Sequence, residues 1–501
     1  MRITCLLLAA FCLCPIVPAQ QSQPVALTIY NQSFAVARTS IDLDLHPGLN
    51  EITTSRVTSM LEPDSVVLRD TATKRPVQVM EQNYDAAVVS QEWLLEKYEG
   101  KTIDFQVGTA QGFEIVPGKI IRAGFNRQPG YTFDGQYMNG QQAQPLIEVN
   151  GHMQFSLPGL PLFPSATDGL LLKPTLRWQI NSSAAEHLKA ELAYITGGFD
   201  WNATYNVIAP QTAEAPAVEK VDVFGWVTIH NQSGTDFDEA RIKLMAGDVA
   251  KIRQGGYGAM ALKAAGAVLV NAGPVQGPEV TQKAFDDFHL YDLNRTVALR
   301  DGETKQVQFI EAADVSMHRK YLYDGLGAQL QPIYAGNVNQ NQGYGLDNAN
   351  TKVVIVEEIK NSDSNHLGMP LPAGRVRLYR RDQDAQMEFV GESLINHTPA
   401  EDTVKVPTGS AFDVKGSRRQ TDFHVDYNRR MIDETFEIRL SNQKAQRVDV
   451  AVIEHLYRCE NWEITAKSSD FSKRDSHTLE FPLSVPAKGE ASLTYTVHYT
   501  W

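Results

Sequence analysis

The sequence predicts an all-β protein, built as multi-domain antiparallel β-sandwiches with one short helix in the N-terminal region. Runs of β-branched and aromatic residues alternate with polar residues along the chain, and glycine, proline, asparagine and aspartate bound them, as in short strands. Neighbouring runs are joined by short turns, which indicates antiparallel pairing. No unit of about 20 to 50 residues repeats, so neither a propeller nor a solenoid is expected.

The predicted strands occur from one end of the chain to the other. Examples are VALTIYNQSFAVARTSIDLDL (25–45), LKAELAYITG (188–197), VDVFGWVTIHNQSG (221–234), TKVVIVEEIKNS (351–362) and EASLTYTVHYTW (490–501). In the last of these, large apolar residues occupy every second position from Leu493 to Trp501. This strand is therefore expected to bury one face against a partner sheet of a sandwich.

One segment has helical rather than strand character. SQEWLLEKYEG, residues 90–100, begins with a serine suited to capping the first turn and ends with a glycine suited to stopping a helix. We predict a short helix here.

Composition shifts divide the chain into an expected order of parts. They are a signal peptide at 1–19, an N-terminal β-rich domain at 20–187, a first β unit at 188–333 and a C-terminal β-sandwich at 351–501. A Gly/Ala-rich stretch near 249–284 is expected to be a mobile insertion, with a lid or a membrane-touching loop as the alternative. The Gly/Asn-rich residues 334–350 read as a connector.

The first residues predict export. One arginine precedes an apolar run from Cys5 to Leu13, and Val-Pro-Ala then ends at a cleavage point after Ala19. The run is well short of the ~20 residues of a membrane-spanning helix, so a cleaved signal is favoured over an anchor. Lipid attachment at Cys14 is disfavoured by the bulky residues before it. A periplasmic or extracellular location is expected, with no transmembrane span in the mature chain.

Cysteine content and charge limit the partners. Cleavage removes three of the four cysteines and leaves Cys459, so no intramolecular disulfide can form; a buried hydrophobic role for Cys459 is favoured over a reactive thiol. The net charge of −13 becomes about −14 when Arg2 is removed. An acidic chain without basic blocks is a poor partner for nucleic acid.

The stretch from Arg375 to Asn396 predicts a hairpin. Val376 and Leu378 fall on one face of the first strand, while arginines occupy most of the other, and Asp382 to Ala385 form the turn. Gly391 marks a bulge in the second strand. Arginines with cross-strand partners such as Glu388 and Glu392 suit a solvated face, and a binding patch is the alternative.

Two clusters of acidic residues are candidate metal sites. FDDFHLYDL offers Asp286, Asp287, His289 and Asp292, but in a strand Asp286 points away from the face that Asp287 and His289 share. GTDFDEA offers Asp236, Asp238 and Glu239 to calcium, yet Asn231 and Gly234, which accept unusual backbone angles, indicate a turn with its acids in solvent. No metal site and no cofactor are predicted.

Two further possibilities concern aromatic residues and catalytic motifs. Trp201, Tyr205, Trp226 and Phe237 could stack against sugars, but sheet cores are the commoner use of such residues. The sequence lacks the nucleophile elbow, the zinc-protease helix motif, the phosphate-binding loop and the EF-hand loop. The catalytic residues, if there are any, are unknown.

Several stretches together resemble one protein family. LPAGRVRLYRR, FVGESLINHTPAEDTVKVPTGSAFDVKGSRRQTDF, EIRLSNQKAQRVDVAVIEHL, LAYITGGFDWNATYNV and SQEWLLEKYEGK are similar to a bacterial exported family known only as a domain of unknown function. Distant relatives are called mucoidy-inhibitor A-like and typically contain an N-terminal coiled coil, for which this chain has no heptads. The resemblance covers most of the mature chain and supplies no catalytic residues.

These observations lead to a functional hypothesis. The expected protein is exported and non-enzymatic, and it acts in the bacterial cell envelope as a scaffold or binding module for protein or polysaccharide. The alternative is a hydrolase acting on envelope or extracellular glycans, which dispersed acids and aromatics would suit. The sequence leaves the oligomeric state open.

Overall fold

The computed structural model describes residues 25–86, 90–110, 112–124, 144–164, 173–212, 216–251, 280–326, 338–344 and 350–501. About 66% of the structure is strand and 3% is helical, so the predicted all-β fold with one short helix is confirmed. The segment predicted to be a signal peptide, residues 1–19, and most of the predicted Gly/Ala-rich insertion lie outside the described residues. None of the described helices is long and apolar enough to cross a bilayer.

The predicted helix forms as α1 (Gln91–Lys97). The hydroxyl oxygen of Ser90 accepts a hydrogen bond from the backbone N–H of Trp93 at 3.2 Å, which satisfies one of the free donors of the first turn. Gly100 follows with φ +77°, a left-handed conformation that favours glycine. Leu95 is its fully buried residue and anchors the helix to a neighbouring sheet.

A seven-stranded sheet forms one layer of the first sandwich. Its strands, in spatial order, are β16 (Val280–Phe285), β17 (Phe288–Leu299), β15 (Phe237–Ala246), β1 (Val25–Tyr30), β2 (Phe34–Leu45), β12 (Glu186–Gly197) and β4 (Val67–Asp70). The pair β1 and β15 is parallel, and the others are antiparallel. The division predicted between residues 187 and 188 falls inside β12, and strands from both sides of it pair in this sheet.

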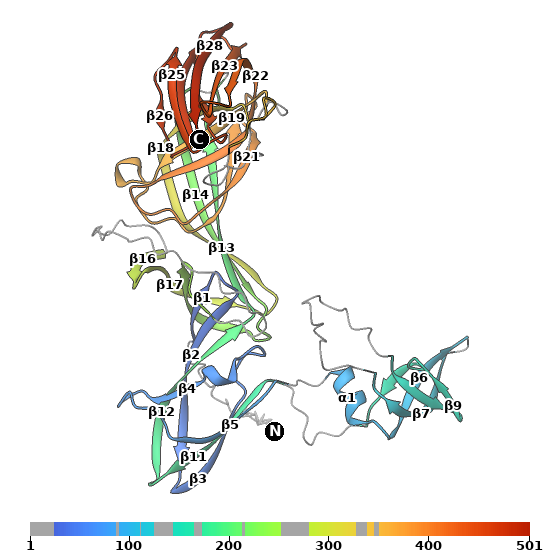
Figure 1. Ribbon diagram of the computed structural model, residues 1–501. Coiled ribbons are helices and arrows are strands. Elements are labelled where there is room, and N and C mark those ends of the chain that lie inside the picture. Colours follow the sequence, from blue (N-terminus) through green and yellow to red (C-terminus); the bar gives the residue numbers. More distant parts are fainter. Residues whose placement is uncertain are drawn as a thin grey trace, which may run out of the picture.

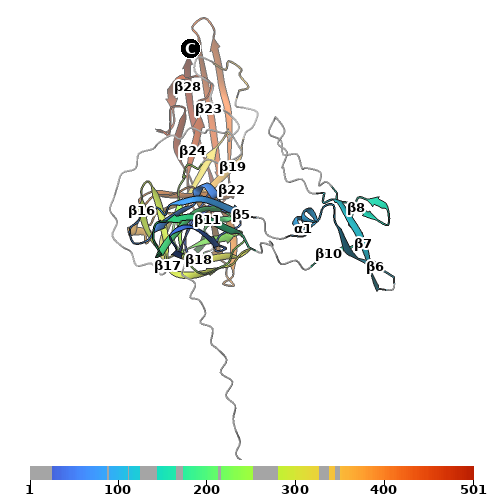
Figure 2. The same ribbon diagram turned by 90° about the horizontal axis from the view of Figure 1, so that it is seen from below.

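Two smaller sheets belong to the N-terminal part of the chain. The three-stranded sheet contains β3 (Gly48–Thr54), β11 (Thr175–Ser182) and β5 (Val79–Asp85), and the 3-10 turn η1 (Pro63–Ser65) lies nearby in the chain. The five-stranded sheet contains β10 (Leu160–Leu162), β6 (Thr102–Thr109), β7 (Gly112–Arg122), β8 (Leu146–Val149) and β9 (His152–Gln154). With α1, this five-stranded unit stands apart from the other sheets in both views (Figures 1 and 2).

A thirteen-stranded sheet runs through the rest of the molecule. Its main path is β21 (Met387–Ile395), β20 (Gly374–Arg381), β13 (Phe199–Ala209), β14 (Val218–Asn231), β18 (Thr304–Asp324), β19 (Lys352–Lys360), β22 (Thr403–Asp426), β23 (Met431–Asn442), β28 (Gly489–Thr500) and β25 (Asn461–Lys467). Beside this path lie β24 (Val448–His455), β27 (Thr478–Val485) and β26 (Ser472–Lys473), and η3 (Asp363–Asn365) follows β19.

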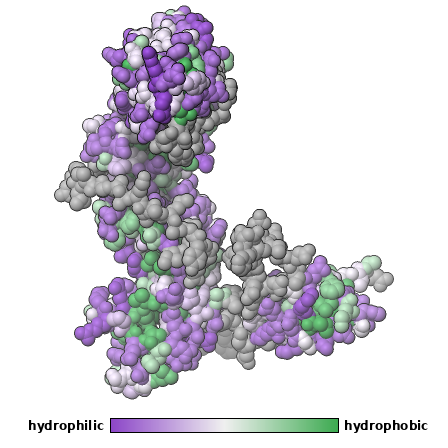
Figure 3. Space-filling view, in the orientation of Figure 1, coloured by the Kyte–Doolittle hydropathy of each residue, from purple (hydrophilic) through white to green (hydrophobic). Residues whose placement is uncertain are grey.

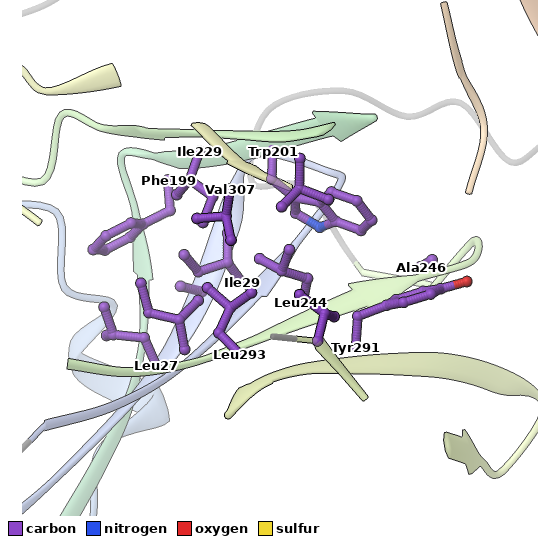
Figure 4. Packing of buried hydrophobic residues seen from close by; sticks show 14 of the residues in the cluster. Leu27, Ile29, Phe199, Trp201, Ile229, Leu244, Ala246, Tyr291, Leu293 and Val307 are labelled. Atoms are coloured by element: carbon purple, nitrogen blue, oxygen red, sulfur yellow. The ribbon is translucent and has the colours of Figure 1, made fainter. Parts of the chain in front are cut away.

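Two large hydrophobic cores lie along this sheet. In the first, buried residues of the seven-stranded sheet pack against β13, β14 and the first part of β18; Figure 4 shows Leu27 and Ile29 facing Trp201 and Val307. The second core fills the C-terminal sandwich, and its members include Leu493, Tyr495, Val497 and Tyr499, as predicted for the last strand. Strands β18 and β22 contribute side chains to both cores, so no flexible linker separates the two sandwiches.

The long strand β18 changes its buried face along its length. Pairing of β14 with β18 shifts register between Val221 and Val223 and again between Gly225 and Trp226. Asp314 of β18 has φ +57°, an unusual conformation for a residue with a side chain. Such bulges bend a strand and change the direction in which its side chains point, so β18 can contribute side chains to both cores.

Candidate functional site

A groove lies at the point along β18 where pairing with β14 ends and pairing with β24 begins. The backbone N–H of Arg319 donates to the carbonyl oxygen of Ala217 at 2.8 Å, just before β14 begins. Two residues later, Tyr321 pairs with Val450 of the parallel strand β24. The notch between these partners forms a groove of about 440 Å³. This volume suits a small ligand or one segment of a polymer.

Charged side chains dominate the functional groups of the groove. Its charged lining residues are Arg319, Lys320, Lys444, Arg447, Asp449 and Glu480. The lining thus carries a surplus of two positive charges on a chain whose net charge is −13. A locally positive concave surface on an acidic protein attracts anionic groups.

Two of the four cations are committed to the protein itself. Arg319 contacts Glu357 at 2.6 Å, and both side chains are almost fully buried. The ammonium of Lys320 lies 2.7 Å from a carboxylate oxygen of Glu358. Arg319 thus holds the wall of the groove in place, and the charge of Lys320, whose side chain is 59% exposed, is balanced by Glu358.

The other two cations are available to a ligand. The ammonium of Lys444 lies over the ring of Tyr321, 5.8 Å from its centre, and forms no ion pair among the described residues. Arg447 is largely exposed and lies 3.7 Å from the equally exposed Asp449. Because both groups are in solvent, this ion pair contributes little to stability. We identify Lys444 and Arg447 as the candidate binding residues.

A buried set of charges supports the groove from behind. Arg380 of the predicted hairpin makes a bidentate contact with Glu219, at 2.6 and 2.9 Å. Burial raises the pKa of the nearby Glu357, and the positive charge of Arg319 opposes this effect. The charges join β20, β14, β18 and β19, so the groove is built on a rigid sheet.

The hairpin from Arg375 to Asn396 forms as predicted. Val376 and Leu378 are buried, and the pairing of β20 with β21 shifts register beside Gly391, where the bulge was expected. Glu392 approaches both Arg375 and Arg377, at 3.7 and 3.3 Å. Glu388 lies opposite Arg380, but the partner of Arg380 is Glu219.

The cluster Asp286, Asp287, His289 and Asp292 is part of the hairpin of β16 and β17. Asp286 has φ +55° in its turn, and Asp292 lies 3.5 Å from the ammonium of Lys243. Across the described ranges, no three His, Cys, Asp or Glu side chains are grouped so as to hold a metal ion.

The three acids predicted to lie in one solvated turn are divided between two elements: Asp236 lies in the turn before β15, whereas Asp238 and Glu239 lie within that strand and are exposed. An oxygen of Asp236 accepts from the backbone N–H of Asp301, whose own carboxylate accepts from the N–H of Gly234, both at 2.8 Å. Gly234 has φ +75°, as the turn prediction required. The expectation of an unusual backbone angle at Asn231 is wrong, because its buried side chain instead donates to the carbonyls of Thr235 and Leu299.

Most of the aromatic residues considered for sugar stacking are in the core. Trp201, Tyr205 and Phe237 are buried, and the ring of Tyr205 meets that of Phe309 edge-on at 5.7 Å. Trp226 is half-buried on the other face of β14. The interpretation of these residues as core is confirmed for three of the four.

Sequence reasoning missed a buried ionic cluster in the C-terminal sandwich. Both oxygens of Glu434 are bound by Arg458, at 2.6 and 3.0 Å, and Arg458 also donates to the backbone carbonyls of Asn339 and Asn341. Arg458 therefore holds part of the predicted connector against the sandwich. Its neighbour Cys459 is buried as predicted. The only hint of this cluster in the sequence was the position of Arg458 beside Leu456, Tyr457 and Cys459 in EHLYRCENW.

A half-buried histidine should make stability depend on pH. Burial lowers the pKa of His289 below its ordinary value of 6.5, and the nearby His397 adds to this effect. Below about pH 6.5 the unfolded chain therefore binds a proton that the folded chain resists, so folding stability is lost as the pH falls. The thermal midpoint should drop between pH 7.5 and 5.5, and less so in His289→Gln.

A second histidine provides a control of opposite sign. The hydrogen bond that His187 donates to the carboxylate of Asp44 raises the pKa of this exposed histidine, so its small contribution to stability is present at low pH and is lost as the pH rises. His187→Gln should not reduce the loss of stability on acidification. Parallel pH slopes for the wild type and His289→Gln would contradict the assignment to His289.

Fold and site define an all-β protein with several sheets and an open groove lined by cations. No protein-family model matches this chain, and no curated protein matches it significantly. The resemblance to the exported bacterial family stays a prediction.

Proposed function

We propose that this protein is exported and acts in the bacterial cell envelope as a non-enzymatic scaffold or binding module, which takes an anionic segment of a protein or polysaccharide into the groove between its sandwiches. The observation that carries the proposal is the pair Lys444 and Arg447, two accessible cations in a groove of about 440 Å³ on an acidic chain. Carboxylate groups are the complementary chemistry.

Two other features support this proposal. The signal-like residues 1–19 favour export, and the single remaining cysteine is buried, as suits a chain that folds without disulfides. The strands shared by the two sandwiches give a stiff support on which the groove keeps its shape. A preformed site of this kind loses little free energy to ordering on binding.

Binding of an acidic polymer tests the proposal. Calorimetric titration with polygalacturonate oligomers should show binding that weakens as salt is added, because exposed charges are screened. Neutral maltoheptaose should bind much less. Lys444→Glu combined with Arg447→Glu should weaken binding of the acidic polymer by about tenfold or more.

The matched control is an exposed arginine at the opposite end of β23. Arg429 lies in the turn before that strand, whereas Lys444 follows its last residue. Arg429→Glu changes the net charge in the same direction and should leave affinity nearly unchanged. Equal losses in both variants, or no preference for the acidic polymer, would overturn the assignment of the groove.

The alternative, a hydrolase of glycans, rests on one observation. Asp449 and Glu480 both line the groove, and paired carboxylates are the usual machinery of glycoside hydrolysis. Release of new reducing ends from the same oligomers, abolished by Asp449→Asn or Glu480→Gln, would favour it over the binding module.

A further inference from the structure

Among the described residues, one face of the five-stranded sheet is covered and the other face is bare. Inward-facing residues such as Ile103 and Phe105 form a small core with α1, whose fully buried members are Leu95, Ile103, Phe105, Ile120, Ala123 and Ile147. Large apolar residues also project from the opposite face. Phe113, Ile115 and Leu160 are 76%, 61% and 66% exposed. A hydrophobic area is visible on this unit in Figure 3.

The pairing register puts these residues on one face. Leu160 of β10 lies opposite Gln106 of β6, which in turn lies opposite Ile115 of β7. Directly paired residues point to the same side of a sheet, so Leu160 and Ile115 flank the narrow polar row on β6. Leu162 and Met153, also exposed, extend the face toward both edges.

The size of this face fits an interface better than an ordinary surface. Five large residues that are between 40% and 76% exposed amount to roughly 600 Å² of mainly apolar area, the upper limit for the largest patch on a typical monomer. Two such faces together would bury about 1,200 Å², the lower limit for a specific and stable interface. The area is therefore sufficient for pairing with an equal partner.

Charges beside the apolar residues match a second copy of the same face. Lys119 and Glu148 are paired in register, and Asp104 lies opposite Pro117, so both signs occur on this side of the sheet. In an interface with two-fold symmetry, a residue away from the axis meets a different residue of the other copy, so Lys119 of one chain can meet an acidic residue of the other. A surface of a single sign would repel itself.

We propose that two copies of this chain associate through the bare faces of their five-stranded sheets. The pairing converts two single sheets, each with a core of six fully buried residues, into one two-layered sandwich. A small core is a weak source of stability on its own, so the second layer stabilises the unit as well as joining the chains. The surface is separate from the groove.

Sedimentation velocity of the intact mature chain tests this proposal. The wild type should change from monomer to dimer as concentration rises toward about 100 µM, as for a moderate affinity. Ile115→Asp and, separately, Leu160→Asp should each weaken dimerisation by at least about tenfold, because each places a charge in the apolar centre of the interface. Both positions are exposed, so circular dichroism should show an unchanged folded monomer.

The control is an exposed apolar residue of another sheet. Phe412 in β22 is 88% exposed, and Phe412→Asp should dimerise like the wild type. A wild type that stays monomeric at the highest concentration would overturn the proposal. Dimers that survive both Ile115→Asp and Leu160→Asp, or that are lost equally in Phe412→Asp, would do so as well. None of these three results would bear on ligand binding at Lys444.

Discussion

Replacing Arg458 with alanine should lower the free energy of unfolding of the C-terminal sandwich by about 3 to 5 kcal/mol, because Glu434 would then be left buried without its cation. The change also removes the donors to the carbonyls of Asn339 and Asn341. Urea denaturation followed by circular dichroism measures the effect.

A double variant separates the charge from the packing. Arg458→Met combined with Glu434→Leu removes both charges and keeps most of the volume, so it should be clearly less destabilised than Arg458→Ala. A double variant that loses as much stability as the two single variants added together would show that the pair acts through packing alone.

Replacing Leu378 with aspartate should destabilise the first sandwich by several kcal/mol, about 3 or more, because a charge would be buried without a partner. Leu378 lies in the first core, between strands β13 and β21. Arg377→Ala, on the other face of the same strand, should cost less than about 1 kcal/mol, since its contact with Glu392 is at the surface. Equal shifts of the denaturation midpoint would mean that the faces are assigned incorrectly.

Local features of the fold were predictable because they depend on neighbours in the chain. The alternation of apolar and polar residues predicted the hairpin of β20 and β21 and its buried face. The serine before α1 and the glycine after it predicted where the helix begins and ends. The positive φ of Gly234 followed from turn chemistry. Each of these rests on a few adjacent residues.

Pairing between distant strands was not predictable from local pattern. β1 pairs in parallel with β15, more than 200 residues later in the chain, and β13 pairs in parallel with β20. The alternation of a strand fixes its faces but does not identify its neighbour. For the same reason, the groove could not be foreseen, because Lys444 and Tyr321 meet only when β24 is placed beside β18.

The strands shared by the two sandwiches have a mechanical consequence. β18 and β22 each pass from the first core to the second, so bending the molecule at the junction would have to break ladder hydrogen bonds and expose apolar side chains. A tensile load applied across the junction would travel along these strands and be resisted by many hydrogen bonds at once. The groove, which lies beside β18 at this point, would then be distorted only when the load approaches that needed to unfold a sandwich. The shared strands would therefore keep the groove in shape under strain.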